Sequence, residues 1–153
     1  MTMALTILGK TPCVLCGSTI QERERTVSFP PLVPNQLDPL YVFNDTAMHE
    51  DCFQRHPLAE AASLRYREML DKTGPGSHRC LACAKPIDNP DDLVVFGHLT
   101  ADRSHPLFSY NYLQFHRGCL RAWPQRGRVL DLLYDLRERW RGPALDWLIK
   151  QMA

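Results

Sequence analysis

The spacing of apolar residues predicts short strands, each followed by short helices. Residues 25–29 and 92–96 are rich in β-branched and aromatic side chains, which is typical of strands. Residues 40–43 and 107–110 are also apolar, and we expect them to be the hairpin partners of those two strands. The pattern therefore predicts two small hairpins.

Helical periodicity follows each predicted hairpin. Residues 124–141 carry apolar side chains with the i, i+3, i+4, i+7, i+11 spacing of one helix face: Val129, Leu132, Leu133, Leu136 and Trp140. Residues 57–72 have a similar spacing, and both segments begin with a proline, which is favoured in a first helical turn. A Gly-Pro break at residues 142–143 precedes a last short helix at residues 144–152. The predicted fold class is α+β.

The cysteines and their histidines recur with a constant offset of 67 positions. The six cysteines form two Cys-x-x-Cys pairs and two single cysteines, and a histidine stands three residues before each single cysteine. The first set is Cys13, Cys16, His49 and Cys52, and the second set is Cys80, Cys83, His116 and Cys119. Other residues follow the same offset, as in the pairs Ile20/Ile87, Val27/Val94, Phe29/Phe96 and Asn44/Asn111. The ungapped match indicates an internal duplication.

The boundary between the copies falls in a stretch rich in glycine and proline, residues 73–77. We therefore expect a first module with a trailing helix in residues 1–73 and a second in residues 78–141. Residues 142–153 form a C-terminal helical extension. Modules of about 45 to 65 residues bury too little apolar surface to be secure without a cross-link or a metal.

Cysteine and histidine in this pattern favour zinc, which takes thiolate and imidazole ligands in a tetrahedron. A Cys-x-x-Cys turn presents two sulfurs to one ion. A His-x-x-Cys pair lies on one face of a helical turn, so we expect His49 and His116 each to open a short helix. The expected cofactors are two structural Zn²⁺ ions. Because a unit that was copied whole should fold alone, each set should close its own site rather than share ligand pairs in a cross-braced arrangement.

Disulfides, buried free thiols and iron–sulfur clusters are the alternatives to zinc. Six cysteines could form three disulfides, but disulfides do not explain a histidine three residues before each single cysteine. Mixed Cys/His ligation is much commoner for zinc than for iron–sulfur clusters.

The same ligand count argues against an enzyme. A catalytic zinc keeps one position for water, whereas four protein ligands fill each predicted site. Glu50 follows His49, but Arg117 stands at the equivalent place in the second copy, which speaks against a shared acid–base role.

Each copy is expected to consist of a Cys-x-x-Cys turn, called the knuckle, then a hairpin and then a helix that bears the last ligands. This is the order of elements in a treble clef. The Cys-x-x-Cys … His-x-x-Cys pattern resembles the first zinc half of a LIM domain over residues 13–56 and 80–123, which implies a tandem of zinc-stabilised treble clefs. The chain departs from that family in two ways. No further cysteines follow each His-x-x-Cys to build an adjoining zinc module, and 32 residues between ligand pairs exceed the LIM spacing. LIM-type partner choice is therefore not carried over.

Composition narrows the setting of the protein. The chain has 153 residues and a formal net charge of +1, so overall charge does not recruit nucleic acid or an anionic membrane. Residues 1–10 lack the basic and apolar regions of a signal peptide, and no stretch approaches the roughly 18 apolar residues of a membrane span. We expect a cytoplasmic protein with reduced thiols.

The functional hypothesis is a non-enzymatic protein–protein interaction or adaptor module. The loops at residues 30–39 and 97–106 differ most between the copies while their flanks match, and variable loops on a constant scaffold are typical of binding surfaces. A bacterial toxin or effector neutralised by this protein is one partner that the hypothesis includes.

Nucleic acid is the alternative partner, contacted by the arginines of the C-terminal half: Arg121, Arg126, Arg128 and Arg139. Interleaved acidic residues favour instead a solvated, salt-bridged helix face.

The remaining tryptophans and histidines have ordinary structural interpretations. We expect Trp140 to fill the core, and we leave Trp147 open between core and interface. His56, His78, His98 and His105 are expected on the surface or in loops, with a third metal at His98 and His105 as a minor alternative.

Overall fold

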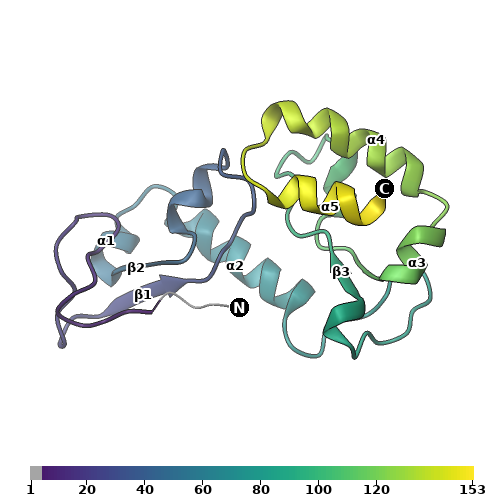
Figure 1. The fold of residues 1–153 in the computed structure, drawn as a ribbon. Coiled ribbons are helices and arrows are strands. Elements are labelled where there is room, and N and C mark those ends of the chain that lie inside the picture. Colours follow the sequence, from purple (N-terminus) through teal and green to yellow (C-terminus); the bar gives the residue numbers. More distant parts are fainter. Residues whose placement is uncertain (1–4) are drawn as a thin grey trace. The chain divides into compact units, whose positions relative to one another are not determined.

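The computed structural model describes residues 5–153 and divides into two compact units (Figure 1). The first unit runs to Val33 and continues over Asp38–Glu68, and the second contains Pro34–Leu37 and Met69–Ala153. Residues 1–4, which belong to the predicted first module and to the segment in which no signal peptide is expected, lie outside the described residues. Among residues 5–153, no helix combines the length and the apolarity that a bilayer crossing requires.

The first unit is built on a two-stranded antiparallel sheet. Strand β1, Thr26–Phe29, pairs with strand β2, Thr46–His49, in a register that sets Thr26 opposite His49 and Phe29 opposite Thr46. Helix α1, Glu50–Gln54, follows β2 directly, and helix α2, Ala59–Thr73, begins in this unit. The mixture of helix and sheet predicted from the sequence is confirmed.

The prediction that residues 40–43 form a strand paired with β1 is wrong. This segment is a 3-10 helix, η1, Pro39–Phe43, and the strand that pairs with β1 begins three residues after it. The Asp38 side chain caps the helix by accepting a hydrogen bond from the backbone amide of Leu40 at 2.8 Å. Leu40 and Phe43 are both buried, and a separation of three residues matches one face of a 3-10 helix rather than the alternation of a strand.

The second unit repeats this arrangement. Strand β3, Leu93–Val95, pairs with strand β4, Gln114–His116, and helix α3, Arg117–Ala122, follows β4. A short 3-10 helix, η2, Pro90–Asp92, precedes β3. The predicted strand at residues 107–110 is again a 3-10 helix, η3, Pro106–Tyr110, which His105 caps by accepting a hydrogen bond from the amide of Leu107. The same error in both copies has the same cause, a capping side chain followed by proline.

The C-terminal helices belong to the second unit. Helix α4, Arg126–Leu136, continues into the 3-10 helix η4, Arg137–Arg139, so the helix predicted over residues 124–141 is shorter than expected. Helix α5, Ala144–Met152, has the predicted bounds and packs beside α4 (Figure 1). Trp140 lies after the helical segment with extended backbone, yet packs against the core as expected.

Each unit encloses its own hydrophobic core. The core of the first unit contains the packed rings of Phe29, Phe43 and Phe53 among aliphatic residues such as Ile20 and Met48. The core of the second unit joins residues of β3, β4 and α3 to four buried residues of α5: Leu145, Leu148, Ile149 and Met152. The segment 142–153 therefore completes this core rather than standing apart from it.

One asparagine organises the long loop of each unit. The Asn44 side chain accepts hydrogen bonds from the amides of Leu32 and Val33 and donates one to the Val33 carbonyl. Asn111 makes the same three bonds with Leu99 and Thr100. Because both copies contain this bond set, the matched asparagines share a structural role.

The segment Pro34–Leu37 is held by the second unit. The Asn35 side chain donates from Nδ2 to the carbonyl of Arg139 and accepts at Oδ1 from the backbone amide of Arg141. The backbone amide of Gln36 donates to the carbonyl of Arg141. Part of the loop at residues 30–39, which the sequence suggests as a partner contact, is thus engaged within the chain.

Candidate metal centres

The first Cys/His cluster forms where a knuckle meets the junction of β2 and α1. The knuckle is a tight turn in which the amide of Gly17 donates to the carbonyl of Cys13. His49 ends β2 and forms the N-cap of α1, and Cys52 lies in the first turn of that helix. This helix start presents the imidazole and the third sulfur on one side, toward the knuckle.

The four donor atoms of the first cluster lie within 4.8 Å of one another. The Nδ1 atom of His49 is 3.4 Å from the Cys16 sulfur and 3.7 Å from the Cys52 sulfur. Cys13 is buried and Cys16 is exposed, so the cluster sits at the edge of the core with one side toward solvent.

The second cluster has nearly the same geometry. The donor atoms of Cys80, Cys83, His116 and Cys119 also lie within 4.8 Å of one another. The Nδ1 atom of His116 is 3.4 Å from the Cys83 sulfur and 3.9 Å from the Cys119 sulfur. The structure therefore brings together both predicted ligand sets, each within its own copy rather than cross-braced.

All six cysteines are free thiols in the described chain, which contradicts the disulfide alternative. Within residues 5–153, these two clusters are the groups of three or more metal-binding side chains that come close enough to share an ion. The minor alternative of a third metal at His98 and His105 is thus not supported. His98 lies in a loop, as expected, but it is buried and packs beside the Tyr112 ring.

The first thiol of each knuckle, Cys13 or Cys80, favours the thiolate form. Burial raises the pKa of the Cys13 thiol, but hydrogen bonds from the backbone amides of Cys16 and His49 outweigh burial and lower this pKa to about 6. The corresponding amides of the second cluster outweigh burial in the same way and lower the pKa of Cys80 to about 6. Backbone amides thus prepare one sulfur of each cluster to bind a cation.

The helix thiols show the opposite shift. Burial and the proximity of the two knuckle thiols raise the pKa of Cys119 to about 11, and the same causes raise the pKa of Cys52. Three sulfurs in so small a space repel one another once they are ionised. A divalent cation between them removes that repulsion.

The two ligand histidines differ in the hydrogen-bond partner of Nε2, the ring nitrogen that points away from the sulfurs. The Nε2 atom of His49 is 3.0 Å from the Glu24 carboxylate, whereas that of His116 is 3.2 Å from the backbone carbonyl of Pro86. Because a carboxylate and a backbone carbonyl only accept hydrogen bonds, Nε2 is the donating nitrogen in both contacts, and the neutral ring then has its lone pair on Nδ1, toward the sulfurs. Sequence reasoning missed both outer partners, because their distance along the chain gives no local spacing that would point to them.

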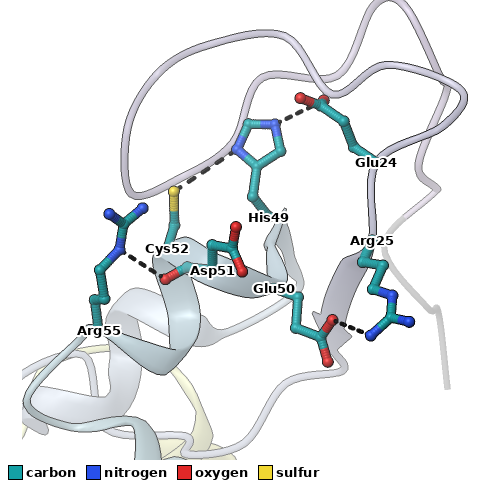
Figure 2. Close-up of a pocket in the computed structure, with 7 residues that line it drawn as sticks. All are labelled: Glu24, Arg25, His49, Glu50, Asp51, Cys52 and Arg55. Atoms are coloured by element: carbon teal, nitrogen blue, oxygen red, sulfur yellow. Dashed lines mark hydrogen bonds and ion pairs between the residues drawn. The ribbon is translucent and has the colours of Figure 1, made fainter.

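Figure 2 shows the pocket that surrounds this contact in the first unit, with the His49 ring between Cys52 and Glu24. The pocket has a volume of about 310 Å³ and is lined by charged side chains and two ligand residues: Glu24, Arg25, His49, Glu50, Asp51, Cys52 and Arg55. Glu50 forms an ion pair with Arg25 at 3.7 Å. The hydrogen bond from the Gln21 amide, with burial opposing it and His49 assisting it, lowers the pKa of the Glu24 carboxyl.

The donor sets fit a metal ion. Three thiolates and one imidazole are the ligands of tetrahedral zinc sites, and soft sulfur ligands disfavour magnesium or calcium. Four protein donors per cluster complete a tetrahedron, which is the composition of a site that stabilises structure. The structure thus supports two clusters that could each hold one metal ion.

The tryptophans of the second unit differ in burial, and Arg126, one of the arginines considered for nucleic acid, has a partner within the unit. Trp123 is buried beside Phe115 and Phe96, whereas Trp147 is 46% exposed. Arg126 donates to the carbonyl of Met152.

Comparison of the chain with protein-family models, with curated proteins and with solved structures found no match in any of the three.

Proposed function

We propose that each cluster holds one structural Zn²⁺ and that the protein is a non-enzymatic protein–protein interaction module made of two treble-clef-type zinc units. The observation that carries the metal assignment is the convergence of three sulfurs and one imidazole nitrogen within 4.8 Å, twice, from matching elements. Convergence of this kind without disulfides suits an ion that cross-links the knuckle to the helix.

The energetic role of zinc follows from the size of each unit. Each sheet has two strands, and a two-stranded hairpin is at best marginally stable alone. Structural zinc contributes about 10 kcal/mol or more in small finger peptides, against a net stability of about 5–15 kcal/mol for a typical domain. Zinc would therefore decide whether the knuckle and the helix stay together.

An interaction role is supported by exposed apolar side chains at equivalent positions of the two knuckles. Val14 follows the first cysteine of its knuckle and is 41% exposed, and Leu81 holds the same position in the second knuckle and is 51% exposed. A rigid turn that presents an apolar side chain to solvent suits burial against a protein surface.

Nucleic-acid binding is supported less well, because several arginines of the C-terminal half have internal partners. Arg126 donates to the Met152 carbonyl, Arg117 donates to the Asp91 carbonyl, and Arg137 pairs with Asp146 at 2.5 Å. Arginines committed to such contacts are poorly placed to neutralise phosphates.

The metal assignment is tested by elemental analysis of reduced, full-length protein purified without added chelator. We expect two zinc ions per chain. Cys16→Ser and Cys83→Ser should each reduce the content to about one, because a structural site seldom survives loss of one thiolate. Metal-free wild-type protein that keeps its near-ultraviolet circular dichroism would contradict the assignment.

The interaction role is tested by using zinc-loaded protein to capture partners from a lysate of the cells that naturally produce it. We expect V14D or L81D to lose a partner that wild-type protein retains, because a buried unpaired carboxylate is costly. L64D is the matched control, since Leu64 is a similarly exposed apolar residue, at 53%, that lies on α2 and not in a knuckle. Partner retention by both knuckle variants would contradict the proposed surface. Salt-sensitive retention of wild-type protein on DNA or RNA would favour the nucleic-acid alternative.

A further inference from the structure

The two clusters have the same set of donor atoms, but a different group contacts the outer nitrogen, Nε2, of each histidine. In both, the ring nitrogen that faces the sulfurs is Nδ1, at 3.4 Å from the second knuckle sulfur. The opposite nitrogen of His49 meets a carboxylate, and that of His116 meets a neutral carbonyl. The donor sets are therefore equal, and the outer contacts differ in charge.

The Glu24 carboxylate is held in place by its own turn. Its Oε2 atom accepts a hydrogen bond from the Gln21 amide at 2.7 Å and lies 3.0 Å from His49 Nε2. The Glu24 amide donates to the Gln21 carbonyl, which closes residues 21–24 into a compact turn just before β1. A carboxylate anchored in this way has a fixed position relative to the ring.

The residue at the equivalent place in the second unit does not have this role. Asp91 lies in η2, and its backbone carbonyl accepts a hydrogen bond from Arg117 Nε at 2.6 Å. The Arg117 amide donates to the neighbouring carboxylate of Asp92. Asp91 and Asp92 thus contact Arg117, the first residue of α3, and the His116 ring bonds to Pro86 instead.

A carboxylate behind a ligating imidazole acts through the ring. It fixes the tautomer and the orientation of the ring, and its negative charge makes the nitrogen on the far side a stronger donor to a metal. A backbone carbonyl fixes the tautomer but carries no full charge. Loss of such outer partners typically costs about 10–100-fold in metal affinity.

We propose that Glu24 is a positioning residue for the metal of the first cluster, and that its contact with His49 makes the first cluster retain zinc more strongly than the second. This inference rests on the proposed occupancy of both clusters by zinc. The two ions would therefore dissociate with different ease, and the ion of the Cys80 cluster would be lost before that of the Cys13 cluster when zinc is scarce.

The test is competition between zinc-loaded, full-length protein and a chromophoric chelator, followed in parallel by NMR of the cysteine β-protons to assign each release step to its cluster. We expect two release steps, with the second cluster emptied first. E24Q keeps an oxygen that can accept a hydrogen bond from Nε2 but removes the negative charge. It should therefore lower the zinc affinity of the first cluster about 10–100-fold and leave that of the second cluster unchanged. E22Q is the matched control, because Glu22 is an exposed acid in the same turn.

A second readout separates positioning from general stability. In wild-type protein the Nε2 proton of His49 should appear in ¹H–¹⁵N spectra further downfield than that of His116, and E24Q should shift the His49 signal alone. An E24Q effect that falls equally on both clusters, or one of less than twofold on the first, would overturn the inference while leaving the proposed function intact. Fewer than two zinc ions in wild-type protein would instead contradict the proposed function.

Discussion

At the scale of single residues, the two knuckles place different residue types, a glycine and an alanine, in the same left-handed backbone conformation. Gly17 has φ of +76° and its equivalent, Ala84, has φ of +60°, so both occupy the left-handed region. In each case the amide of this residue donates to the carbonyl of the first knuckle cysteine. Glycine adopts this conformation without steric cost, whereas an L-residue loses about 1–2 kcal/mol there. The second knuckle is therefore strained by its alanine.

This difference predicts opposite effects for a reciprocal pair of substitutions. A84G should stabilise the second unit by about 1 kcal/mol, and G17A should destabilise the first by a similar amount. Apart from Gly17 and its two chain neighbours, no atom of the described residues lies within 4 Å of the Cβ that G17A would add, so the penalty comes from backbone conformation rather than from a clash. Urea unfolding in excess zinc, followed by circular dichroism, measures both changes.

The control for this pair is G127A. Gly127 lies in α4, and the Cβ that alanine would add there also meets no atom within 4 Å, so the substitution should be neutral or stabilising. Equal destabilisation by G17A and G127A would show that the left-handed backbone is not the cause.

At the scale of elements, helix α5 decides how the second unit closes its core. Four of its residues are buried, and Leu148 is only 2% exposed. The helix contacts both α3 and α4, and α3 contains the last cysteine of the second cluster. Packing of α5 therefore supports the element that presents Cys119.

We expect L148A to destabilise the second unit by about 2–5 kcal/mol, because it removes a buried side chain and leaves a cavity. Lys150 lies on the exposed face of the same helix, so K150A should change stability by less than about 0.5 kcal/mol. Urea midpoints in excess zinc, read from tryptophan fluorescence, give both values. A small effect of L148A would mean that α5 contributes little to the unit.

At the scale of the whole molecule, two separate cores and two separate clusters predict two local unfolding events. All three tryptophans lie in the second unit, with Trp123 in its core, so their fluorescence reports on that unit alone. The core of the first unit contains phenylalanines but no tryptophan.

We therefore expect C83S to alter tryptophan fluorescence and C16S to leave it nearly unchanged, while each lowers the helical circular dichroism in part. Chelation should reproduce both losses together, because zinc cross-links the knuckle and the helix in each unit. A fluorescence change in C16S as large as that in C83S would show that the two units unfold as one.

The sequence alone determined the features that depend on local spacing. A Cys-x-x-Cys turn and a His-x-x-Cys helical turn place their donors by i and i+3 geometry, so the candidate ligands could be named without coordinates. The bounds of α5 followed from a Gly-Pro break and an apolar stripe for the same reason.

Only the tertiary structure decided the features that depend on residues distant in the chain. Folding decided which segment pairs with each first strand: the partner is the strand that ends at the ligand histidine, and not Pro39–Phe43 or Pro106–Tyr110, which form 3-10 helices. The outer contacts of the two histidines, Glu24 and Pro86, were likewise set by folding, since hydrogen bonds across 25 and 30 positions follow no local period. Local spacing determines which donors can meet, and only long-range packing determines what surrounds them.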